Sequence, residues 1–334
     1  MADAAVKAEG LTIPLIDFGK FLCGTADDKK ETANQVLNGF QNAGFIYLKN
    51  TPITPSFRSH VFNTSAKFFK LPMDEKMSHA WTTPEANRGY SAPGREKVSV
   101  LKAITDVTQL RSSNPDLKET FEIGREGQED MPNHWPKEEG ETSGFKPTML
   151  EFFSQCKALH VEVMRAIAVG MGIDEKYFDN FVDVGDNTLR LLHYPSVKKE
   201  VFKSNPGQVR AGEHTDYGSI TLLFQDGRGG LQVKSPSGEF INATPIENTV
   251  VVNAGDLLAR WSNDTINSTL HRVVEPPNGD VEEYPARYSI AYFCNPNTKA
   301  YIEAIPGTFA AEEEKKYSGI NSGDYLVQRL TATY

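Results

Sequence analysis

The sequence predicts an α+β protein whose core is a double-stranded β-helix, or jelly roll, with flanking helices. Two observations carry this prediction. A long amphipathic helix is expected near residues 148–171, and it is followed by short strand-like runs separated by Gly, Pro, Asn and Asp. Short strands in close succession are typical of sandwiches and barrels, whereas strands alternating with helices would indicate a parallel sheet.

The N-terminal region, residues 1–145, is expected to supply helices, short strands and loops that pack on the core. Residues 29–44 show helical spacing and end at a glycine, and residues 45–49 ("FIYLK") have the aromatic and β-branched density of a strand. Residues 54–72 predict a second helix, stopped by a proline. Residues 81–147 are rich in Pro, Gly and charge, which predicts long loops of the kind that often border a site.

Residues 146–334 are expected to hold the long helix, the jelly-roll catalytic core and a C-terminal helix, and to form one structural unit with the N-terminal region. Thr148 and Glu151 make a capping-box pattern where the long helix is expected to begin. The charged segment 308–330 is again typical of a helix. The strand-like runs are "TLRLLHY", "SITLLFQ", "LQVK", "EFINAT", "TVVVNAGDLLARW", "TLHRVVEP" and "RYSIAYF".

Composition limits the possible partners. The formal net charge of the 334 residues is −9, and a protein that grips phosphate backbones needs clustered Lys and Arg, so no nucleic-acid partner is expected. No apolar run is long enough to span a membrane, and the N-terminus lacks the apolar core of a signal peptide, which favours a cytoplasmic protein. The three cysteines, which fit a reducing compartment and form no metal-binding pair, are Cys23, Cys156 and Cys294.

A metal site is predicted from His214, Asp216 and His271. In a strand, residues i and i+2 point to the same side, so His214 and Asp216 converge while Thr215 turns away. His271 opens a later apolar run and is the best third candidate. Two histidines and one carboxylate leave other coordination positions open, as in non-haem Fe(II) oxygenases.

The H-x-D pair by itself leaves other interpretations open. It also fits a hydrogen-bonded pair or half of a zinc site. A zinc hydrolase or a non-catalytic jelly-roll binding protein is therefore a competing class of function. Most histidines in any chain are not ligands, and this default applies to His60, His79, His134 and His160.

A carboxylate clamp is predicted on the run "RYSIAYF". Strand alternation places Arg287, Ser289, Ala291 and Phe293 on one face, where a guanidinium and a hydroxyl two residues apart suit a carboxylate. The alternative is a surface arginine with a small filler beside it. The short separation from His271 favours the clamp, because an adjacent strand would return beside the metal.

Together these residues resemble the Fe(II)/2-oxoglutarate-dependent dioxygenases, in the branch that includes isopenicillin N synthase and the plant flavonoid and gibberellin oxygenases. The resemblance covers nearly the whole chain, and within the branch it is strongest to the fungal enzymes that oxidise thymine. The motifs that carry it are "IPLIDF", "GFQNAGFIYLKN", "NRGY", "LLHYP", "GEHTDYGSITLLFQD", "GGLQV", "VVNAGDLLARWSND", "STLHRVV" and "RYSIAYFCNP".

The resemblance implies that His214, Asp216 and His271 bind Fe(II), and that Arg287 and Ser289 hold the distal carboxylate of 2-oxoglutarate. The cofactors implied are Fe(II), the cosubstrate 2-oxoglutarate and O2, with ascorbate supporting activity. Many members of the branch carry N-Y-Y-P where this chain has residues 192–195. Tyr194 fits the second tyrosine and is expected to touch the cosubstrate, whereas Leu192 and His193 depart from the pattern and leave open what replaces the asparagine.

Four residues are candidates for substrate binding. Arg190 shares a strand face with Tyr194 and could donate to a pyrimidine carbonyl, the alternative being an ion pair with Asp183 or Asp186. Phe293 is expected to face inward, where it would stack on a flat ring or simply fill the core. The further candidates, for the pocket wall and for the ring edge, are Tyr217 and Asn295.

The function implied is oxidation of the methyl group of free thymine, a small pyrimidine base, stepwise to 5-hydroxymethyluracil, 5-formyluracil and 5-carboxyuracil. The alternative within the class is a 2-oxoglutarate oxygenase that acts on another small planar metabolite in fungal secondary metabolism. The sequence does not specify the oligomeric state, the extent of overoxidation, or whether the loops of residues 81–147 form a lid.

Overall fold

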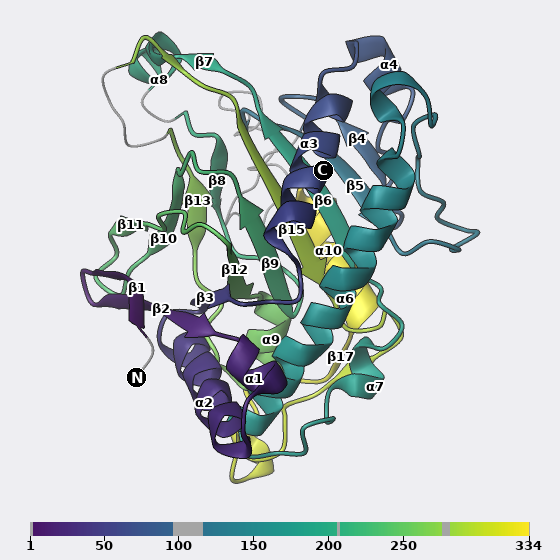
Figure 1. Cartoon of the computed structure of the whole chain (residues 1–334). Helices are drawn as coiled ribbons and strands as arrows, with labels where there is room; N and C mark the ends of the chain where they lie inside the picture. The colour runs from purple at the N-terminus through teal and green to yellow at the C-terminus, as the bar shows by residue number, and fades with distance from the viewer. Residues whose placement is uncertain (1–2, 96–115, 206–207, 276–280, 334) are drawn as a thin grey trace.

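The computed structural model describes residues 3–95, 116–205, 208–275 and 281–333. Within these residues, one sheet of nine strands and one of four form the core, and helices surround them (Figure 1). Two further pairs of short strands lie outside these sheets. The arrangement is the α+β jelly roll that the sequence predicts, and it places residues from both large sheets around one pocket.

The nine-stranded sheet has the order β1-β2-β3-β12-β9-β15-β6-β5-β4. Its neighbouring strands are antiparallel except for the parallel pair β2 and β3. Because β1 to β5 precede the long helix and the other four strands follow it, both halves of the chain build one continuous sheet. The strands are β1 (Asp3–Ala8), β2 (Leu11–Asp17), β3 (Phe45–Lys49), β4 (Gly89–Ser91), β5 (Glu119–Gly124), β6 (Thr188–Tyr194), β9 (Ile220–Gln225), β12 (Thr249–Ala254) and β15 (Arg287–Cys294).

The four-stranded sheet has the order β11-β10-β13-β8 and is antiparallel throughout. Its last two strands carry the predicted metal site, because His271 lies directly opposite His214 in their register. The strands of this sheet are β8 (Ala211–His214), β10 (Leu231–Lys234), β11 (Phe240–Asn242) and β13 (His271–Val273), and the short pairs are β7 (Val197–Lys198) with β14 (Glu283–Tyr284) and β16 (Tyr301–Ile302) with β17 (Ile320–Asn321).

The alternation along β15 separates two environments. Ile290 and Tyr292 are fully buried in the core beneath the long helix, where Phe153 meets the ring of Tyr292 at 5.0 Å between centroids. Arg287 and Ser289 face the opposite side, toward the pocket. The two-residue period of the strand therefore gives the sheet one apolar face for the helix and one functional face.

The long helix α6 (Phe145–Gly170) buries the predicted apolar stripe against the sheet and α2. The capping box predicted at Thr148 is wrong, because Thr148 lies inside the helix and its hydroxyl contacts His60 at 3.1 Å. The helix begins three residues earlier, where the Glu138 carboxylate accepts from the backbone amides of Gly144 (2.7 Å) and Lys146 (2.6 Å). A side chain from a preceding loop thus supplies the cap, which a local sequence motif does not reveal.

The other helices surround the core. The helix predicted over residues 29–44 is present as α2, which ends at Asn42, and Gly44 follows it with φ +68° and no room for a Cβ beside Thr269. The second predicted helix is also present and ends just before the proline at 72. The remaining bounds are α1 (Gly19–Cys23), α2 (Ala26–Asn42), α3 (Pro55–Phe69), α4 (Met73–Met77), α7 (Asp179–Val182), α8 (Lys199–Ser204), α9 (Asp256–Trp261) and α10 (Ser322–Thr333).

Two expectations about secondary structure are corrected. The run "TVVVNAGDLLARW" is a strand only to Ala254, and after Gly255 it becomes α9, which buries Leu257 and Trp261. The segment 308–330 is helical only in the short 3₁₀ turn Glu312–Glu314 and from Ser322 onward. No helix in the described part of the chain is long and apolar enough to cross a membrane.

Residues 81–147 are not all loop. β4 and β5 lie within them and extend the large sheet beyond β6, while residues 96–115 lie outside the described residues. Every residue of β5 is buried, including Glu119 and Glu122. The two glutamates break the apolar pattern by which a buried strand is recognised in a sequence. Residues from other elements compensate their charges, and the sequence pattern does not show these partners.

Candidate active site

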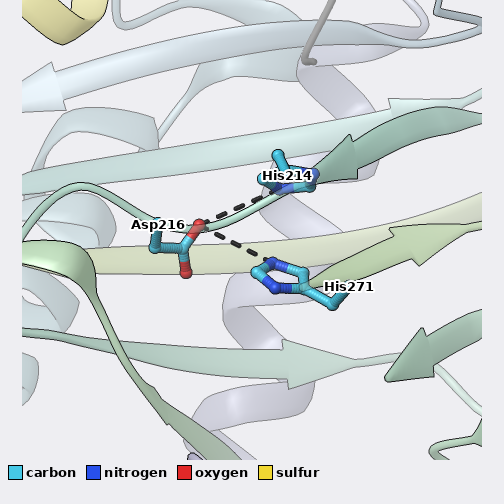
Figure 2. A group of neighbouring side chains, drawn as sticks. All are labelled: His214, Asp216 and His271. Atoms are coloured by element: carbon cyan, nitrogen blue, oxygen red, sulfur yellow. Dashed lines mark ion pairs between the residues drawn. The ribbon is translucent and has the colours of Figure 1, made fainter. Parts of the chain in front are cut away.

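His214, Asp216 and His271 come together on the pocket side of the small sheet (Figure 2). The Nε2 atoms of His214 and His271 lie 3.9 and 3.7 Å from Oδ1 of Asp216. The prediction that Asp216 lies in the strand with His214 is wrong, because β8 ends at His214 and the following turn carries the Asp216 carboxylate. Thr215 also lines the pocket, and its hydroxyl donates to Asp256 at 3.0 Å.

Backbone contacts fix the orientation of both imidazole rings. Nδ1 of His214 lies 2.7 Å from the Gly212 carbonyl, and Nδ1 of His271 lies 3.1 Å from the Thr269 carbonyl. A carbonyl only accepts, so Nδ1 of each ring carries a proton and Nε2 is the ring atom left to bind a metal. Both Nε2 atoms are directed at the space beside Asp216, as metal ligation requires.

The Asp216 carboxylate is held as an anion with one oxygen facing the histidines. Its Oδ2 accepts from Thr221 at 2.5 Å and from the Asn253 amide at 2.7 Å, which leaves Oδ1 toward the imidazoles. Burial opposes ionisation, but the neighbouring histidines and these two hydrogen bonds outweigh it, so the pKa of Asp216 lies below its ordinary value.

His214 is held in its neutral form. Burial, followed by repulsion from His271, lowers the pKa of His214 far below its ordinary value. A neutral imidazole is the form that binds a metal ion. The ligand atoms of the three residues lie within 4.8 Å of one another, a span that one ion with metal–ligand bonds of about 2 Å can bridge. The donor set therefore fits a divalent iron site.

All ten residues predicted for the site line one pocket between the two sheets. The metal-site residues come from the small sheet and its following turn, and most of the others come from β6 and β15 of the large sheet. The residues brought together are His214, Asp216, His271, Arg287, Ser289, Tyr194, Arg190, Tyr217, Phe293 and Asn295.

Arg287 is fully buried and held in place on several sides. It donates to the Gly229 carbonyl at 2.8 Å, to Ser289 Oγ at 3.0 Å and to Gln225 Oε1 at 3.0 Å. Its guanidinium carbon lies 4.9 Å from the centre of the Tyr194 ring. Each of these acceptors is neutral, so the buried guanidinium keeps a positive charge that suits an anionic ligand.

The departures from N-Y-Y-P have a structural explanation. Leu192 lies opposite Ser289 across the two strands and gives this part of the pocket an apolar side chain where the family pattern has an asparagine. His193 points the other way. Its Nδ1 lies 2.6 Å from the Glu119 carboxylate, which also pairs with Lys76 at 2.7 Å, so His193 belongs to a buried network behind the sheet.

Arg190 has an ion-pair partner that the sequence did not suggest. Its Nε lies 2.7 Å from Glu122 Oε1, and Glu122 is fully buried on the neighbouring strand β5. The predicted alternatives, Asp183 and Asp186, have other partners, Asn297 and Arg125 respectively. The partner was missed because β5 was predicted to be loop.

The aromatic candidates lie against guanidinium groups. The Arg190 guanidinium carbon is 5.3 Å from the ring centre of Phe293, and that of Arg329 is 4.6 Å from the ring centre of Tyr217. Asn295 is less available than predicted, because its amide nitrogen donates to the Asp186 carbonyl at 3.1 Å. Its Oδ1 is buried, has no hydrogen-bond partner among the described residues, and faces the tight backbone at Gly218.

Sequence reasoning missed several pocket residues. Asn87, within the "NRGY" motif, accepts from the Trp81 indole at 3.0 Å, and the motif itself was a signal for it. Lys118 is buried and pairs with Asp116 at 3.1 Å. The C-terminal helix contributes two more, Leu326 and Leu330.

Comparison with known families places the chain in one class. Residues 13–138 match the model described as the N-terminal region of non-haem dioxygenases in morphine synthesis, and residues 185–296 match the 2-oxoglutarate–Fe(II) oxygenase superfamily. A 2-oxoglutarate–Fe(II) type oxidoreductase, ppzD of Metarhizium majus, is 33% identical over 96% of this chain and 94% of its own length. The chain therefore belongs to the 2-oxoglutarate–Fe(II) oxygenases and is a dioxygenase that uses Fe(II), 2-oxoglutarate and O2, which confirms the resemblance.

Solved structures give a more specific similarity. Full-length thymine 7-hydroxylase of Neurospora crassa, crystallised with α-ketoglutarate and thymine, is 73% identical, with a TM-score of 0.94 over 99% of this chain and 100% of that one. Its complex with α-ketoglutarate and 5-formyluracil is 70% identical, with a TM-score of 0.91 over 99% of each chain. Among curated relatives, the proline hydroxylase buaE of Petromyces alliaceus is 33% identical over 97% of this chain and its whole length.

Proposed function

We propose that this protein oxidises the methyl group of free thymine to 5-hydroxymethyluracil, 5-formyluracil and 5-carboxyuracil. The observation that carries the proposal is the pocket, in which a two-histidine, one-carboxylate cluster, a buried arginine and two aromatic rings converge. Its support from outside the chain is the 73% identity to a thymine 7-hydroxylase that was crystallised with thymine. A stepwise oxidation requires that the pocket hold the same pyrimidine ring while its 5-substituent changes from methyl to hydroxymethyl, formyl and carboxyl.

His214, Asp216 and His271 are the proposed Fe(II) ligands. When bound, Fe(II) with 2-oxoglutarate and O2 supplies the oxidising power for the methyl C–H bond. The protein's own contribution is to keep the His214 imidazole neutral, to orient Nε2 of both imidazoles toward the cluster, to keep the carboxylate ionised, and to leave one side of the cluster open to the pocket. Thr221 and Asn253 stabilise the charged form of Asp216 and fix which oxygen faces the metal.

Arg287, Ser289 and Tyr194 are proposed to hold the distal carboxylate of 2-oxoglutarate. The buried guanidinium supplies the charge and Ser289 a hydroxyl, while Tyr194 lies against the guanidinium face. Because Gly229 and Gln225 fix the arginine beforehand, little side-chain entropy is lost when the anion binds.

Phe293 and Tyr217 are proposed to enclose the flat pyrimidine ring, and Arg190 to donate to a ring carbonyl. A guanidinium has five N–H donors, so the ion pair with Glu122 orients Arg190 without using all of them. Asn295 is proposed to contact the ring edge. A grip on the ring edge leaves the methyl group turned toward the metal through repeated turnovers.

The proposal is tested by supplying the purified protein with Fe(II), ascorbate, 2-oxoglutarate and thymine. Succinate and 5-hydroxymethyluracil should form together, followed by the formyl and carboxyl products. A protein fully loaded with iron that makes neither product from thymine would refute the proposal.

One alternative is favoured by a specific observation. The curated relatives at about one-third identity include a proline hydroxylase and oxidoreductases with other names. These relatives support a different small metabolite as the second candidate substrate, and the aromatic residues Tyr217 and Phe293 of the pocket favour a planar one. A panel that contains thymine, uracil, other pyrimidines and L-proline separates the two, because only the thymine hypothesis predicts product from a 5-methylpyrimidine above all others.

The cellular setting is part of the same proposal. The three cysteines are free thiols in the structure, and two of them are buried. A reducing, cytoplasmic location fits free thiols and a ferrous enzyme. Microscopy of a tagged protein in its host tests this location.

A further inference from the structure

The C-terminal helix α10 belongs to neither the nine-stranded nor the four-stranded sheet, and it contributes residues to the pocket. Leu326 and Leu330, one turn apart, line the pocket and are half-buried. Between them in sequence, Arg329 places its guanidinium carbon 4.6 Å from the ring centre of Tyr217. The same guanidinium lies 3.0 Å from Oδ2 of Asp256. One arginine therefore contacts both an aromatic wall of the pocket and a carboxylate behind it.

Asp256 is the point at which this contact reaches the metal site. Its Oδ2 accepts from Thr215, between His214 and Asp216, and its Oδ1 accepts from Ser268 at 2.7 Å, shortly before His271. Its backbone amide donates to the Asp216 carbonyl at 2.8 Å. Asp256 thus ties together the two segments that carry the metal-site residues, and Arg329 adds α10 to them.

We propose that Arg329 is a positioning residue that holds Tyr217 against a planar heterocyclic substrate and couples α10 to the turn at 215–217. This inference rests on the proposed function, because it assigns Tyr217 to the substrate pocket. A guanidinium over one face of the ring restrains its rotation by a cation–π contact, and the ion pair with Asp256 fixes the guanidinium in turn. The substrate then meets a wall that is already in place.

A second arginine provides a matched control. Arg260, on α9, also lies over a tyrosine, with its guanidinium carbon 4.8 Å from the ring centre of Tyr317. It also donates to a backbone carbonyl, that of Ser318, at 2.6 Å. Neither Arg260 nor Tyr317 lines the pocket that holds the metal site. Removal of Arg260 therefore deletes the same type of contact without touching the proposed wall.

The kinetic experiment compares Arg329→Ala and Arg260→Ala with the wild type. In Arg329→Ala we expect KM for thymine to rise roughly five- to tenfold, from the loss of the cation–π contact and the ion pair, with KM for 2-oxoglutarate unchanged. More succinate should form per molecule of oxidised thymine, because 2-oxoglutarate turnover is more often uncoupled from thymine oxidation when thymine is held less firmly. Arg329→Lys should recover part of the loss, and Arg260→Ala should leave both KM values unchanged. Equal changes in both KM values, or no change, would overturn the inference.

A second readout does not depend on the substrate. Hydrogen exchange of the full-length protein should be faster in Arg329→Ala at the amides of residues 215–218 and of α10, but unchanged in β15. Asp256→Asn should also speed exchange at these amides, and adding Arg329→Ala to it should change exchange less than Arg329→Ala does in the wild type, because the ion pair between the two residues is already lost. If the wild type does not oxidise thymine, the proposed function fails. Unchanged exchange at residues 215–218 would overturn the role of Arg329 whatever the substrate is.

Discussion

The two sides of the pocket are built differently. The side that contains Arg287 and Ser289 lies within one strand of the large sheet, and both residues are almost completely buried. The other side combines a turn after β8, the far end of the same strand and the helix α10, and its aromatic residues Tyr217 and Phe293 are only half-buried. The first side is buried within one strand, whereas the second is assembled from elements that meet only in the folded chain.

This difference matches a division of labour. A strand with a two-residue period places the guanidinium and the hydroxyl on one face with little freedom, which suits a cosubstrate that the whole family shares. Loops and a terminal helix tolerate substitution, which suits a site that determines the substrate. A curated relative at one-third identity, the proline hydroxylase buaE, belongs to the same family under a name that gives a different activity.

The metal centre lies between the two sides, so its loss is expected to have the largest effect. His214→Ala should reduce succinate formation and thymine oxidation together, by about a thousandfold or more, because one of the three proposed ligands is lost. Far-UV circular dichroism should show that the variant remains folded. Succinate formation at the wild-type rate would refute the assignment of His214 as a ligand.

Removal of the clamp should affect only the cosubstrate side. Arg287→Ala deletes a buried cation and should raise KM for 2-oxoglutarate by about a hundredfold, since the loss of one partner of a buried charge pair costs roughly 2–5 kcal/mol. KM for thymine should change little. Steady-state kinetics with each substrate varied in turn measures both constants. A matching rise in KM for thymine would show that the two sides are not independent.

Arg190 should reveal both a binding and a structural role. Arg190→Leu removes the ion-pair partner of the fully buried Glu122, so the free energy of unfolding should fall by roughly 3–5 kcal/mol. The double variant Arg190→Leu/Glu122→Leu should recover most of this stability but not the affinity for thymine. Urea denaturation and thymine kinetics on the same samples test the two parts. If the double variant restores thymine binding, Arg190 serves only as the partner of Glu122.

The smallest expected effect is on the pH dependence of stability, through His160, which contacts Ser219 just after the turn at 215–217. His160 is fully buried, Nε2 lies 3.3 Å from Ser219 Oγ, and burial followed by repulsion from Lys157 lowers the pKa of His160 to about 3. The unfolded state therefore takes up a proton below about pH 6.5 while the folded state does not, so this contribution to stability is present above that pH and is lost as the pH falls.

The test is urea denaturation of the metal-free protein at pH 7.5 and 5.5. The wild type should lose about 1.4 kcal/mol more than His160→Gln between these two values, since one pH unit below the unfolded pKa corresponds to that amount. An equal loss in both proteins would show that His160 titrates in the folded state.

Much of the site was predictable because it depends on short-range patterns. The H-x-D pair, the distant histidine and the R-x-S strand, together with the neighbouring Tyr194 and Tyr217, account for seven of the ten site positions, and strand alternation predicted the inward orientation of Phe293. The partner of Arg190 and the cap of α6 were not predictable. Glu122 lies in a buried strand whose charged residues break the apolar pattern, and Glu138 contacts the start of the helix from a loop.

The sequence by itself determined the class of chemistry, because the H-x-D pair, the later histidine and the R-x-S motif together resemble the Fe(II)/2-oxoglutarate dioxygenases, the family that the comparisons show. Only the tertiary structure decided which groups complete the pocket. Arg329, Asp256 and Glu122 are charged residues in ordinary-looking segments, and their roles come from contacts between elements far apart in the chain. Such contacts leave no local periodic signal, since they depend on how helices and sheets pack after each has formed.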